Sequence, residues 1–497
     1  MNTPDTHNPA KSTVDTQTVV DALSAQLPAH CLLHREEELK PYECDGLSAY
    51  RRTPMLVALP ESVEHIRAVL RYCHENAIPV VARGAGTGLS GGALPLENGV
   101  LLSLARFNKI LSIDADNRTA RVQPGVRNLA ISEAAAEHNL YYAPDPSSQI
   151  ACSIGGNVAE NAGGVHCLKY GLTVHNIQQL EILTIDGEAL SIGTEALDTP
   201  GFDLLALLTG SEGLLAIITE ITVKLLPKPA VAKVMLASFS DVAQAGQAVS
   251  DIIASGIIPA GLELMDKGSI RASEDFVHAG YPLDAAAILL CEVDGDAWQV
   301  EDELAKARQV LLDSGASEIR VARDEEERLR LWAGRKAAFP AVGRLAPDYY
   351  CMDGTIPRHQ IAEVLTRIEQ LSEEYGLAVV NVFHAGDGNL HPLILYDANR
   401  PGELERTEEF GGRILEACVE LGGSITGEHG VGMEKINQMC VQFNENELTQ
   451  FHAIKQAFDP KGLLNPGKAI PTLQRCAEFG AMHVHHGKLP FPELDRF

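Results

Sequence analysis

Two histidines flank a short turn-forming stretch in the second half of the chain and could hold a metal ion. His384 and His391 lie in the sequence FHAGDGNLHP, which spans the junction of two β-rich runs at residues 377–383 and 390–396. A two-residue turn at Asp387-Gly388 would make the histidines a cross-strand pair, with Cβ atoms about 4.5–5.5 Å apart. Two imidazoles at that separation can converge on one metal ion. Two ligands do not make a site, so a pair of structural histidines beside a turn stays the alternative.

A third ligand is available in the glycine-flanked segment TGEHGVG, residues 426–432. Glu428 would complete a set of two histidines and one carboxylate, which suits zinc or another divalent transition metal such as manganese, iron or cobalt. Neighbouring residues of an extended segment point to opposite sides. We therefore expect His429 to face a different target from Glu428 and to act as a proton acceptor.

The N-terminal half contains a glycine-rich loop of the kind that binds phosphate. The sequence RGAGTGLSGGA, residues 83–93, matches the dinucleotide-binding pattern G-x-G-x-x-G. The helix that a nicotinamide-binding domain needs inside this loop is missing, since Pro95 and an apolar run at residues 100–104 follow. The loop still lets backbone N–H groups converge on a phosphate, because glycines place no side chain in the way. The alternative to a phosphate-binding loop is a flexible surface turn.

Two further segments are also rich in glycine and in small polar residues. IGGNVAENAGG, residues 154–164, follows PDPSS at residues 144–148, and TGSEG, residues 209–213, precedes a strand-like run. The first two glycine-rich loops could clamp the two ends of one pyrophosphate-bearing ligand.

Length and composition limit the class of protein. The chain has 497 residues, which suggests two or three domains. Sixty-seven acidic and forty basic side chains give a net charge of −27, so nucleic-acid binding has no electrostatic basis. The first residues do not form a secretory signal and no transmembrane helix is predicted, so we expect a cytoplasmic protein. Ten cysteines without a CxxC or a close pair favour buried thiols over disulfides.

The spacing of apolar residues predicts the elements that position these motifs. Helices are expected at residues 14–26, 62–76 and 361–375; Ser62 would cap the second, and Gly376 would end the third. Pro227-Lys228-Pro229 marks the end of the first large domain.

Taken together, the three glycine-rich segments resemble the flavin-binding domain of the vanillyl-alcohol oxidase and p-cresol methylhydroxylase flavoproteins. In that family the first loop wraps the FAD pyrophosphate and the second lies along the pyrophosphate and ribityl chain. The matching positions are Gly84, Ala85, Gly86, Thr87, Gly88, Ser90, Pro146, Ser147, Gly155, Gly156, Asn157, Asn161, Gly164, Glu212, Gly213 and Ile218. Some relatives attach flavin through a His or Cys in these loops. We interpret Cys152, His166 and Cys167 as structural, so we expect non-covalent FAD.

The segments FHAGDGNLHP, GEHGVG and FDPKGLLNPGK, the last at residues 458–468, resemble the C-terminal domain of the FAD-linked 2-hydroxy acid dehydrogenases. These enzymes act on D-lactate, D-2-hydroxyglutarate or glycolate. The resemblance implies that His384, His391 and Glu428 hold a metal that touches the substrate hydroxyl and carboxylate, and that His429 is the base. It also implies that Arg335, in a W-x-x-R segment, grips the substrate carboxylate. We interpret the neighbouring Lys336 as a solvated charge.

The two resemblances imply an α+β fold with a two-subdomain FAD-binding domain and an α+β substrate domain built on an antiparallel sheet. The expected boundaries are an N-terminal helical segment at 1–50, the FAD-binding domain at 51–229, the substrate- and metal-binding domain at 230–470 and a C-terminal tail at 471–497.

Family members that act on 2-hydroxyglutarate carry polar or basic groups at three positions where this chain has Phe339, Cys351 and Leu393. We therefore expect oxidation of a small monocarboxylate, glycolate, with D-lactate as a second substrate. In this mechanism the metal acidifies the hydroxyl for His429, and a hydride passes from the α-carbon to flavin N5.

The tail, which contains CAEFGAMHVHH at residues 476–486, resembles the tail of the flavin subunits of bacterial glycolate oxidases. Those subunits work with a second flavin-domain-like subunit and an iron–sulfur subunit. The resemblance implies such partners, electron transfer to a partner or quinone rather than chiefly to oxygen, and association with the inner face of the membrane through the partners. We interpret the tail histidines as a loose polar segment or partner contact, not as a metal site.

Three other functions stay open. The first is a stand-alone D-lactate dehydrogenase. The second is a zinc hydrolase whose glycine-rich loops are incidental, because His384, His391 and Glu428 would also suit metal-bound water. The third is a flavin-loaded assembly subunit without catalysis of its own.

Overall fold

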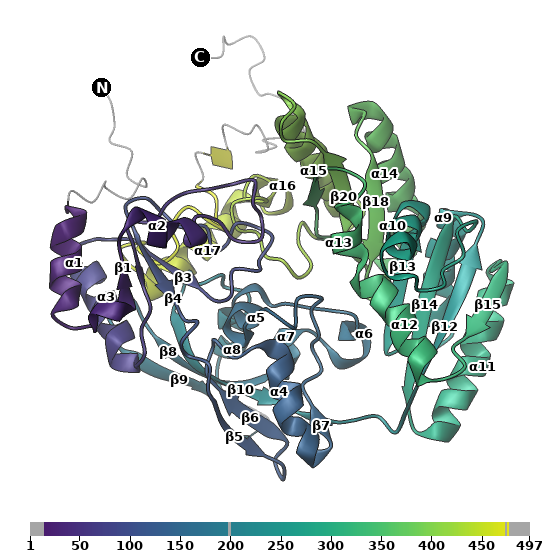
Figure 1. Ribbon diagram of the computed structural model, residues 1–497, viewed down its shortest axis with the longest axis horizontal. Coiled ribbons are helices and arrows are strands. Elements are labelled where there is room, and N and C mark those ends of the chain that lie inside the picture. Colours follow the sequence, from purple (N-terminus) through teal and green to yellow (C-terminus); the bar gives the residue numbers. More distant parts are fainter. Residues whose placement is uncertain (1–13, 197–199, 473–474, 477–497) are drawn as a thin grey trace.

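The chain forms two lobes that both mix helices and strands (Figure 1). The structure is a computed structural model and describes residues 14–196, 200–472 and 475–476. The N-terminal lobe is purple to blue in Figure 1, and the second lobe is teal to green. This arrangement confirms the α+β class.

The N-terminal lobe contains two main sheets. The first has the order β1-β2-β4-β3, in which β1 is antiparallel to three parallel strands. The second is antiparallel and has the order β5-β6-β10-β8-β9, beside a two-stranded ladder of β7 and β11. The strands are β1 (Leu32–Leu33), β2 (Leu56–Ala58), β3 (Val80–Arg83), β4 (Val100–Ser103), β5 (Ile110–Asp114), β6 (Thr119–Val122), β7 (Leu140–Tyr141), β8 (Ile177–Leu183), β9 (Ala189–Gly193), β10 (Ile217–Lys224) and β11 (Leu226–Pro227). Since β1 comes from residues 1–50, part of that segment joins the first sheet.

The second lobe is built on one antiparallel sheet with the order β15-β12-β14-β13-β18-β20-β16, as the sequence predicted. A two-stranded ladder of β17 and β19 lies beside it. The strands are β12 (Val231–Phe239), β13 (Gly261–Asp266), β14 (Ala287–Gly295), β15 (Glu318–Val321), β16 (Asp348–Cys351), β17 (Gly354–Thr355), β18 (Val379–Phe383), β19 (Asn389–Leu390) and β20 (Pro392–Tyr396).

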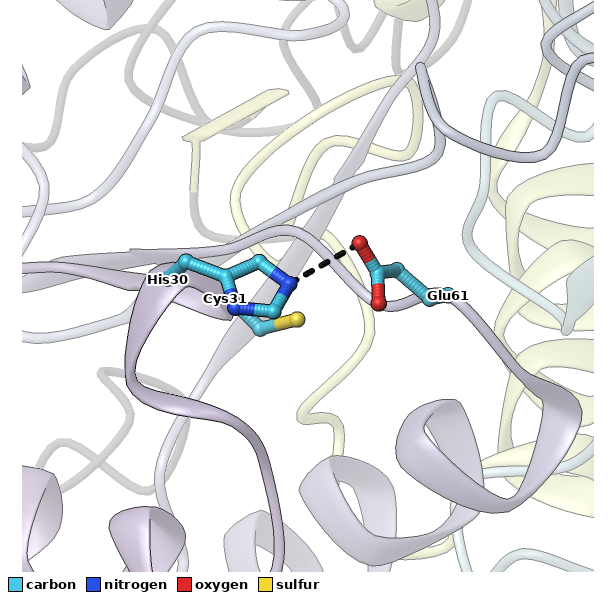
Figure 2. A group of neighbouring side chains, drawn as sticks. All are labelled: His30, Cys31 and Glu61. Carbon is cyan, nitrogen blue, oxygen red and sulfur yellow. Dashed lines mark hydrogen bonds and ion pairs between the residues drawn. The ribbon is translucent and has the colours of Figure 1, made fainter.

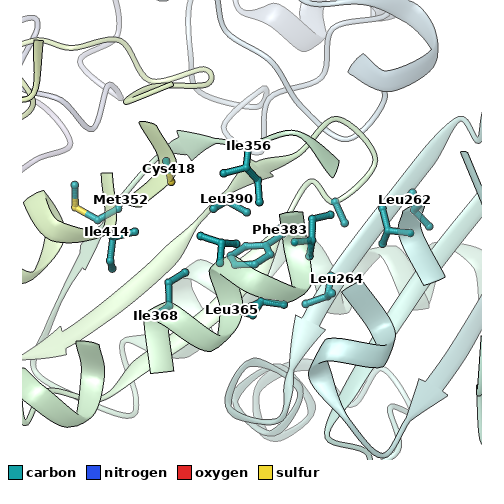
Figure 3. Packing of buried hydrophobic residues seen from close by; sticks show 14 of the residues in the cluster. Leu262, Leu264, Met352, Ile356, Leu365, Ile368, Phe383, Leu390, Ile414 and Cys418 are labelled. Atoms are coloured by element: carbon teal, nitrogen blue, oxygen red, sulfur yellow. The ribbon is translucent and has the colours of Figure 1, made fainter. Parts of the chain in front are cut away.

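Helices cover both faces of this sheet, which explains why almost every residue of β14 is buried. Residues of α9, α11, α14 and α15 form the core on one face, and residues of α10, α12 and α13 form the core on the other. Figure 3 shows part of the first core, in which Leu365 of α14 lies close to Phe383 of β18.

Two predicted helices have the expected bounds and signals. α3 (Val63–Glu75) begins after Ser62, whose side chain accepts a hydrogen bond from the His65 N–H, and α14 (Ile361–Tyr375) ends at Gly376 with φ of +62°. The N-terminal helix is shorter than predicted. The remaining helices are α1 (Thr16–Ser24), α2 (Glu36–Leu39), α4 (Asn128–Ala135), α5 (Ile154–Glu160), α6 (Cys167–Tyr170), α7 (Thr173–Asn176), α8 (Leu204–Leu208), α9 (Val242–Ala254), α10 (Lys267–Val277), α11 (Ala297–Asp313), α12 (Glu325–Lys336), α13 (Ala338–Val342), α15 (Glu403–Glu420), α16 (Met439–Gln442) and α17 (Glu445–Phe458).

The last part of the second domain returns to the first lobe, where Figure 1 shows it in yellow beside the first sheet. Leu464 forms a parallel bridge with Val80 of β3, and Leu463 and Leu464 are buried in the core of that lobe. Asn465 donates to the carbonyl oxygens of Gly92 and Glu212. These contacts fix the first glycine-rich loop against residues 463–465, near the end of the second domain.

Charged side chains join the two lobes around His166. The His166 Nδ1 lies 2.9 Å from Asp145 Oδ2, and Nε2 lies 3.4 Å from Glu292 Oε1 in β14. Lys169 and Tyr170 of α6 reach Asp294 on the same strand. Burial alone would lower the pKa of His166, but the two neighbouring carboxylates outweigh burial and raise the pKa to about 10.

Replacing His166 by Gln is expected to lower the free energy of unfolding by about 2–4 kcal/mol at pH 6. The folded pKa lies above the unfolded value, so this contribution is complete below about pH 6.5 and is lost as the pH rises toward 10. Urea unfolding of both proteins across this pH range measures the difference. A difference that stays constant up to pH 10 would contradict the assignment.

Cys440 and Cys476 form a disulfide, which corrects the expectation that all cysteines are thiols. The two residues are 36 positions apart, so no local spacing pattern pointed to them. The fold brings α16 beside residues 475–476. The other eight cysteines are free thiols, and all but Cys44 are buried.

Within the described residues, no helix combines the length and the apolarity needed to cross a bilayer.

Candidate active site

A cavity of about 490 Å³ lies between the lobes and is lined by residues from both. The first lobe contributes most of the residues expected to bind FAD, namely Gly84, Ala85, Gly86, Thr87, Gly88, Pro146, Ser147, Gly155, Gly156, Asn157, Glu212, Gly213 and Ile218. The second lobe contributes Lys336, Phe339, Pro340, Tyr349, His391, Glu428 and His429. The glycine-rich segments and the histidine–glutamate cluster therefore open on one space.

Three residues expected to contact the cofactor lie outside this lining. Ser90 is buried and donates to the His429 carbonyl oxygen at 2.9 Å. Asn161 ends α5 in a left-handed conformation, and its side chain accepts from the Val174 N–H. A Cβ on Gly164 would lie 2.5 Å from the Asp145 backbone. These residues hold the segments that surround the cavity.

The second glycine-rich segment begins as a helix, which corrects our description of it as a loop. α5 forms because the Ser153 side chain caps its N-terminus by accepting from the Gly156 N–H, and because Ile154 and Val158 are buried in the core. Residues 155–157, in the first turn of this helix, line the cavity.

The first glycine-rich loop fits a ligand that approaches the backbone closely. Gly88 lines the cavity, and a Cβ added there would meet no atom within 4 Å and would occupy open space. A Cβ on Gly84 would lie 2.3 Å from Ser153 Oγ and would push the loop away from α5. This bare backbone cradle suits a pyrophosphate group.

The predicted metal ligands lie together. His384 Nε2 and His391 Nε2 are each 3.2 Å from Glu428 Oε1, and the ring centroids of the histidines are 5.0 Å apart. Donor atoms of the three residues all lie within 4.8 Å of one another. Both ring nitrogens of His391 are buried, and among the described residues no group forms a well-aligned hydrogen bond with either of them. Orphaned imidazole nitrogens beside a carboxylate fit a divalent metal ion.

The hairpin that carries these histidines has a different register from the predicted one. Asn381 pairs with Pro392 and His384 bridges to Asn389, so the turn has four residues and not two. The N–H groups of Gly388 and Asn389 both donate to the His384 carbonyl oxygen and close this longer turn. The change in register is an even number of residues, so His384 and His391 stay on one face as diagonal neighbours.

Glu263 is a functional residue that our sequence analysis missed. It lies on β13, is 1% exposed, and its Oε1 is 2.8 Å from His384 Nδ1. Its Oε2 accepts from Arg335 Nε at 2.7 Å. The signal was an acidic residue inside the apolar run at residues 261–265. Burial alone would lower the pKa of His384, but the negative charges of Glu263 and Glu428 outweigh burial and raise the pKa well above its usual value.

Replacing Glu263 by Gln is expected to weaken metal binding about 10- to 100-fold, because carboxylates behind a ligand histidine fix its ring and raise its basicity. Competition with a chromophoric chelator measures this affinity. Glu318→Gln, an exposed position on β15 of the same sheet, is the matched control. Unchanged metal affinity in Glu263→Gln would show that the Glu263–His384 contact does not serve a metal.

Arg335 and Lys336 differ in their exposure and in their relation to the cavity. Arg335 is 1% exposed, is held by Glu263 through Nε and Nη2, and is not part of the cavity lining. Lys336 is exposed, as expected, but it lines the cavity.

A buried carboxylate shapes the segment that carries Glu428 and His429. Asp353 Oδ2 accepts from the N–H groups of Gly427 at 3.0 Å and His429 at 2.9 Å, and Oδ1 accepts from that of Glu428 at 3.1 Å. Lys435 Nζ lies 3.0 Å from Asp353 Oδ2. Burial alone would raise the pKa of Asp353, but the Lys435 charge helps to hold this pKa well below its usual value. No role for Asp353 was predicted from the sequence.

We expected His429 to face a different target from Glu428. Instead its ring stacks on that of His391, and its Nε2 lies 4.0 Å from Glu428 Oε1. The ring centroids are 4.9 Å apart and the planes differ by 5°. Residues 426–429 are not extended, because the N–H groups of residues 427–429 all donate to the Asp353 carboxylate. Burial lowers the pKa of His429 to about 4, and within the part of the chain that the structure describes its Nδ1 has no hydrogen-bond partner. A neutral imidazole with a free nitrogen at a cavity is able to accept a proton.

A second group with metal-ligand side chains, His30, Cys31 and Glu61, lies in the first lobe (Figure 2). Arg106 Nη1 donates to Glu61 Oε1 at 2.8 Å and contacts Cys31 Sγ at 3.6 Å. The guanidinium thus already supplies the positive charge at this group. We therefore assign no metal to it.

Two family models together match most of the chain. Residues 54–193 match the model of an FAD binding domain, and residues 228–469 match that of the C-terminal domain of FAD linked oxidases. The chain is 69% identical to the glycolate oxidase subunit GlcD of Escherichia coli K12 over 484 residues, 97% of each chain. It is 33% identical to the D-lactate dehydrogenase of Anaerostipes hadrus, over 85% of this chain and 91% of that protein.

A solved structure of p-cresol methylhydroxylase with substrate bound has the same fold. The TM-score is 0.78 at 19% identity, with 92% of this chain and 97% of the other covered.

Proposed function

The chain belongs to the FAD-linked oxidases, and from this premise we propose that it oxidises glycolate, and D-lactate as a second substrate, to the 2-oxo acid with FAD and a divalent metal. The observation that carries the proposal is the single cavity lined by the glycine-rich segments and by His391, Glu428 and His429. The resemblance to GlcD proteins supports glycolate as the substrate, and the resemblance to a D-lactate dehydrogenase supports the second.

In this proposal His384, His391 and Glu428 would hold the metal, which would supply a positive charge that lowers the pKa of the substrate hydroxyl. Zinc suits this ligand set best, and manganese, iron and cobalt are alternatives. FAD, when bound, would supply the two-electron acceptor. His429 accepts the hydroxyl proton, since it is neutral, and Asp353 orients it through the backbone.

Non-covalent FAD is consistent with the chemistry of the lining. Cys152 lines the cavity, but burial raises the pKa of its thiol, so it stays protonated and a poor nucleophile. His166 is engaged by Asp145 and Glu292.

We propose Arg335 as the carboxylate-binding residue, as the family resemblance implies. A guanidinium has five N–H donors, so Glu263 does not exhaust its capacity. The wall next to His391 is apolar, with the Phe339 ring centroid 5.8 Å from that of His391 and 6.4 Å from that of Tyr349. This wall favours a small monocarboxylate, although Lys336 is a cation in the lining that could meet a second carboxylate.

The substrate proposal is tested by anaerobic mixing of purified protein with glycolate, D-lactate or D-2-hydroxyglutarate while the flavin absorbance is followed. We expect glycolate and then D-lactate to bleach the flavin, and chelation to stop both. Bleaching by 2-hydroxyglutarate alone would refute the size argument, and protein without flavin colour would favour a zinc hydrolase.

We further propose that electrons pass to a partner subunit or a quinone. This proposal is supported by the GlcD relatives, each of which is a subunit of a glycolate oxidase. The partner-contact tail at 471–497 lies largely outside the described residues. Activity that needs no co-expressed partner would favour the stand-alone D-lactate dehydrogenase.

A further inference from the structure

Glu212 links the first lobe to the segment that carries the proposed base. It lies in the TGSEG segment between α8 and β10 and is 6% exposed. Its Oε1 accepts from the Val431 N–H and its Oε2 from the Gly432 N–H, both at 2.7 Å. Both carboxylate oxygens are therefore used on the backbone just after His429.

Ser90 of the first glycine-rich loop makes a second link to the same segment. Its hydroxyl donates to the His429 carbonyl oxygen at 2.9 Å, and its carbonyl oxygen accepts from the N–H groups of Met433 and Glu434. The approach is close, because a Cβ on Gly432 would lie 2.1 Å from the Ser90 carbonyl oxygen. A Cβ on Gly430 would lie 3.0 Å from Glu212 Oε1.

The segment is thus held from both lobes. Asp353, in the second lobe, binds the N–H groups of residues 427–429, and Glu212, in the first lobe, binds those of residues 431–432. His429 is therefore held directly by Asp353 and lies two residues before the first N–H group that Glu212 binds. It lines the cavity together with Glu212.

We propose that Glu212 and Ser90 are positioning residues that fix His429 relative to the flavin side of the cavity. The proposal rests on the proposed function. Its rival is the expectation from the family resemblance, that Glu212 and Ser90 contact the cofactor. The two differ in what a substitution weakens first. A lost positioning contact slows substrate oxidation at full cofactor occupancy, whereas a lost cofactor contact weakens FAD binding.

The test compares Glu212→Gln with wild-type holoenzyme. Gln keeps one acceptor oxygen but turns an NH₂ group toward the second backbone N–H. We expect the limiting rate of flavin bleaching by glycolate to fall about 10- to 100-fold. FAD content, metal content and the glycolate concentration for half-maximal rate should stay within about twofold of wild type. Ser90→Ala, which removes one neutral hydrogen bond, should lower the rate about 2- to 10-fold and serves if Glu212→Gln does not fold.

The matched control is Glu220→Gln on β10, where the carboxylate pairs with Arg121 away from the cavity lining. Hydrogen exchange gives a readout independent of turnover. The amides of residues 431–432 should exchange faster in Glu212→Gln and not in Glu220→Gln. Loss of FAD with a wild-type rate after reconstitution, or unchanged exchange and rate, would overturn the proposal. Wild-type flavin that no 2-hydroxy acid bleaches would instead refute the proposed function, while the exchange result would still report on the link.

Discussion

Replacing His429 by Asn should leave the flavin almost fully oxidised on the timescale in which glycolate bleaches the wild type. The expected fall in the bleaching rate is about 10²- to 10⁴-fold, the usual contribution of a general base. Asn preserves a polar side chain of similar reach but cannot accept the hydroxyl proton. The measurement is anaerobic stopped-flow absorbance at saturating glycolate.

The matched control for this substitution is His359→Asn, because His359 is exposed and outside the cavity lining. Its rate should equal that of wild type. FAD and metal content should be unchanged in both variants, since Asp353 and Glu212 hold the backbone on either side of residue 429. A His429→Asn rate within tenfold of wild type would mean that another group takes the proton, or that the protein is an assembly subunit.

Replacing His391 by Ala should remove the metal and, with it, substrate oxidation. The variant loses one of three ligands, and we expect metal content to fall from about one equivalent to near zero and the bleaching rate to fall more than about 10³-fold. FAD should remain bound, because none of the glycine-rich segments is touched. Metal analysis together with flavin absorbance measures both effects on one sample.

Metal add-back distinguishes loss of the ion from damage to the fold. Wild type that has been stripped by a chelator should regain activity with zinc or another divalent ion, and His391→Ala should not. His359→Ala should behave as wild type. Full activity of stripped wild type would remove the metal from the mechanism and leave His384, His391 and Glu428 as a structural cluster.

The elements that position the site were largely predictable, because their signals are local. α14 has the predicted bounds, with a regular apolar stripe and Gly376 at its end. The glycine-rich loop was predictable from its lack of side chains and from the strands that flank it. The cap at Ser153 was a local signal too, but the glycines after it led us to describe α5 as a loop.

The features that escaped prediction depend on contacts between distant segments. Glu263 reaches His384 because β13 pairs with β18, and no spacing in the sequence encodes that pairing. The same holds for the Cys440–Cys476 disulfide and for Glu212, whose partners are more than two hundred residues away. The predicted register of the hairpin was wrong, yet His384 and His391 still lie close together. The observed register differs from the predicted one by an even number of residues, which keeps each side chain on the same face of the sheet.

Anomalous diffraction from crystals of the FAD-loaded enzyme, at the absorption edge of the metal it contains, tests the central claim most directly. We expect one strong peak in contact with His384, His391 and Glu428, on the side of the cavity that faces the flavin. A metal-free cluster in active crystals, or a peak only at His30, Cys31 and Glu61, would contradict the account.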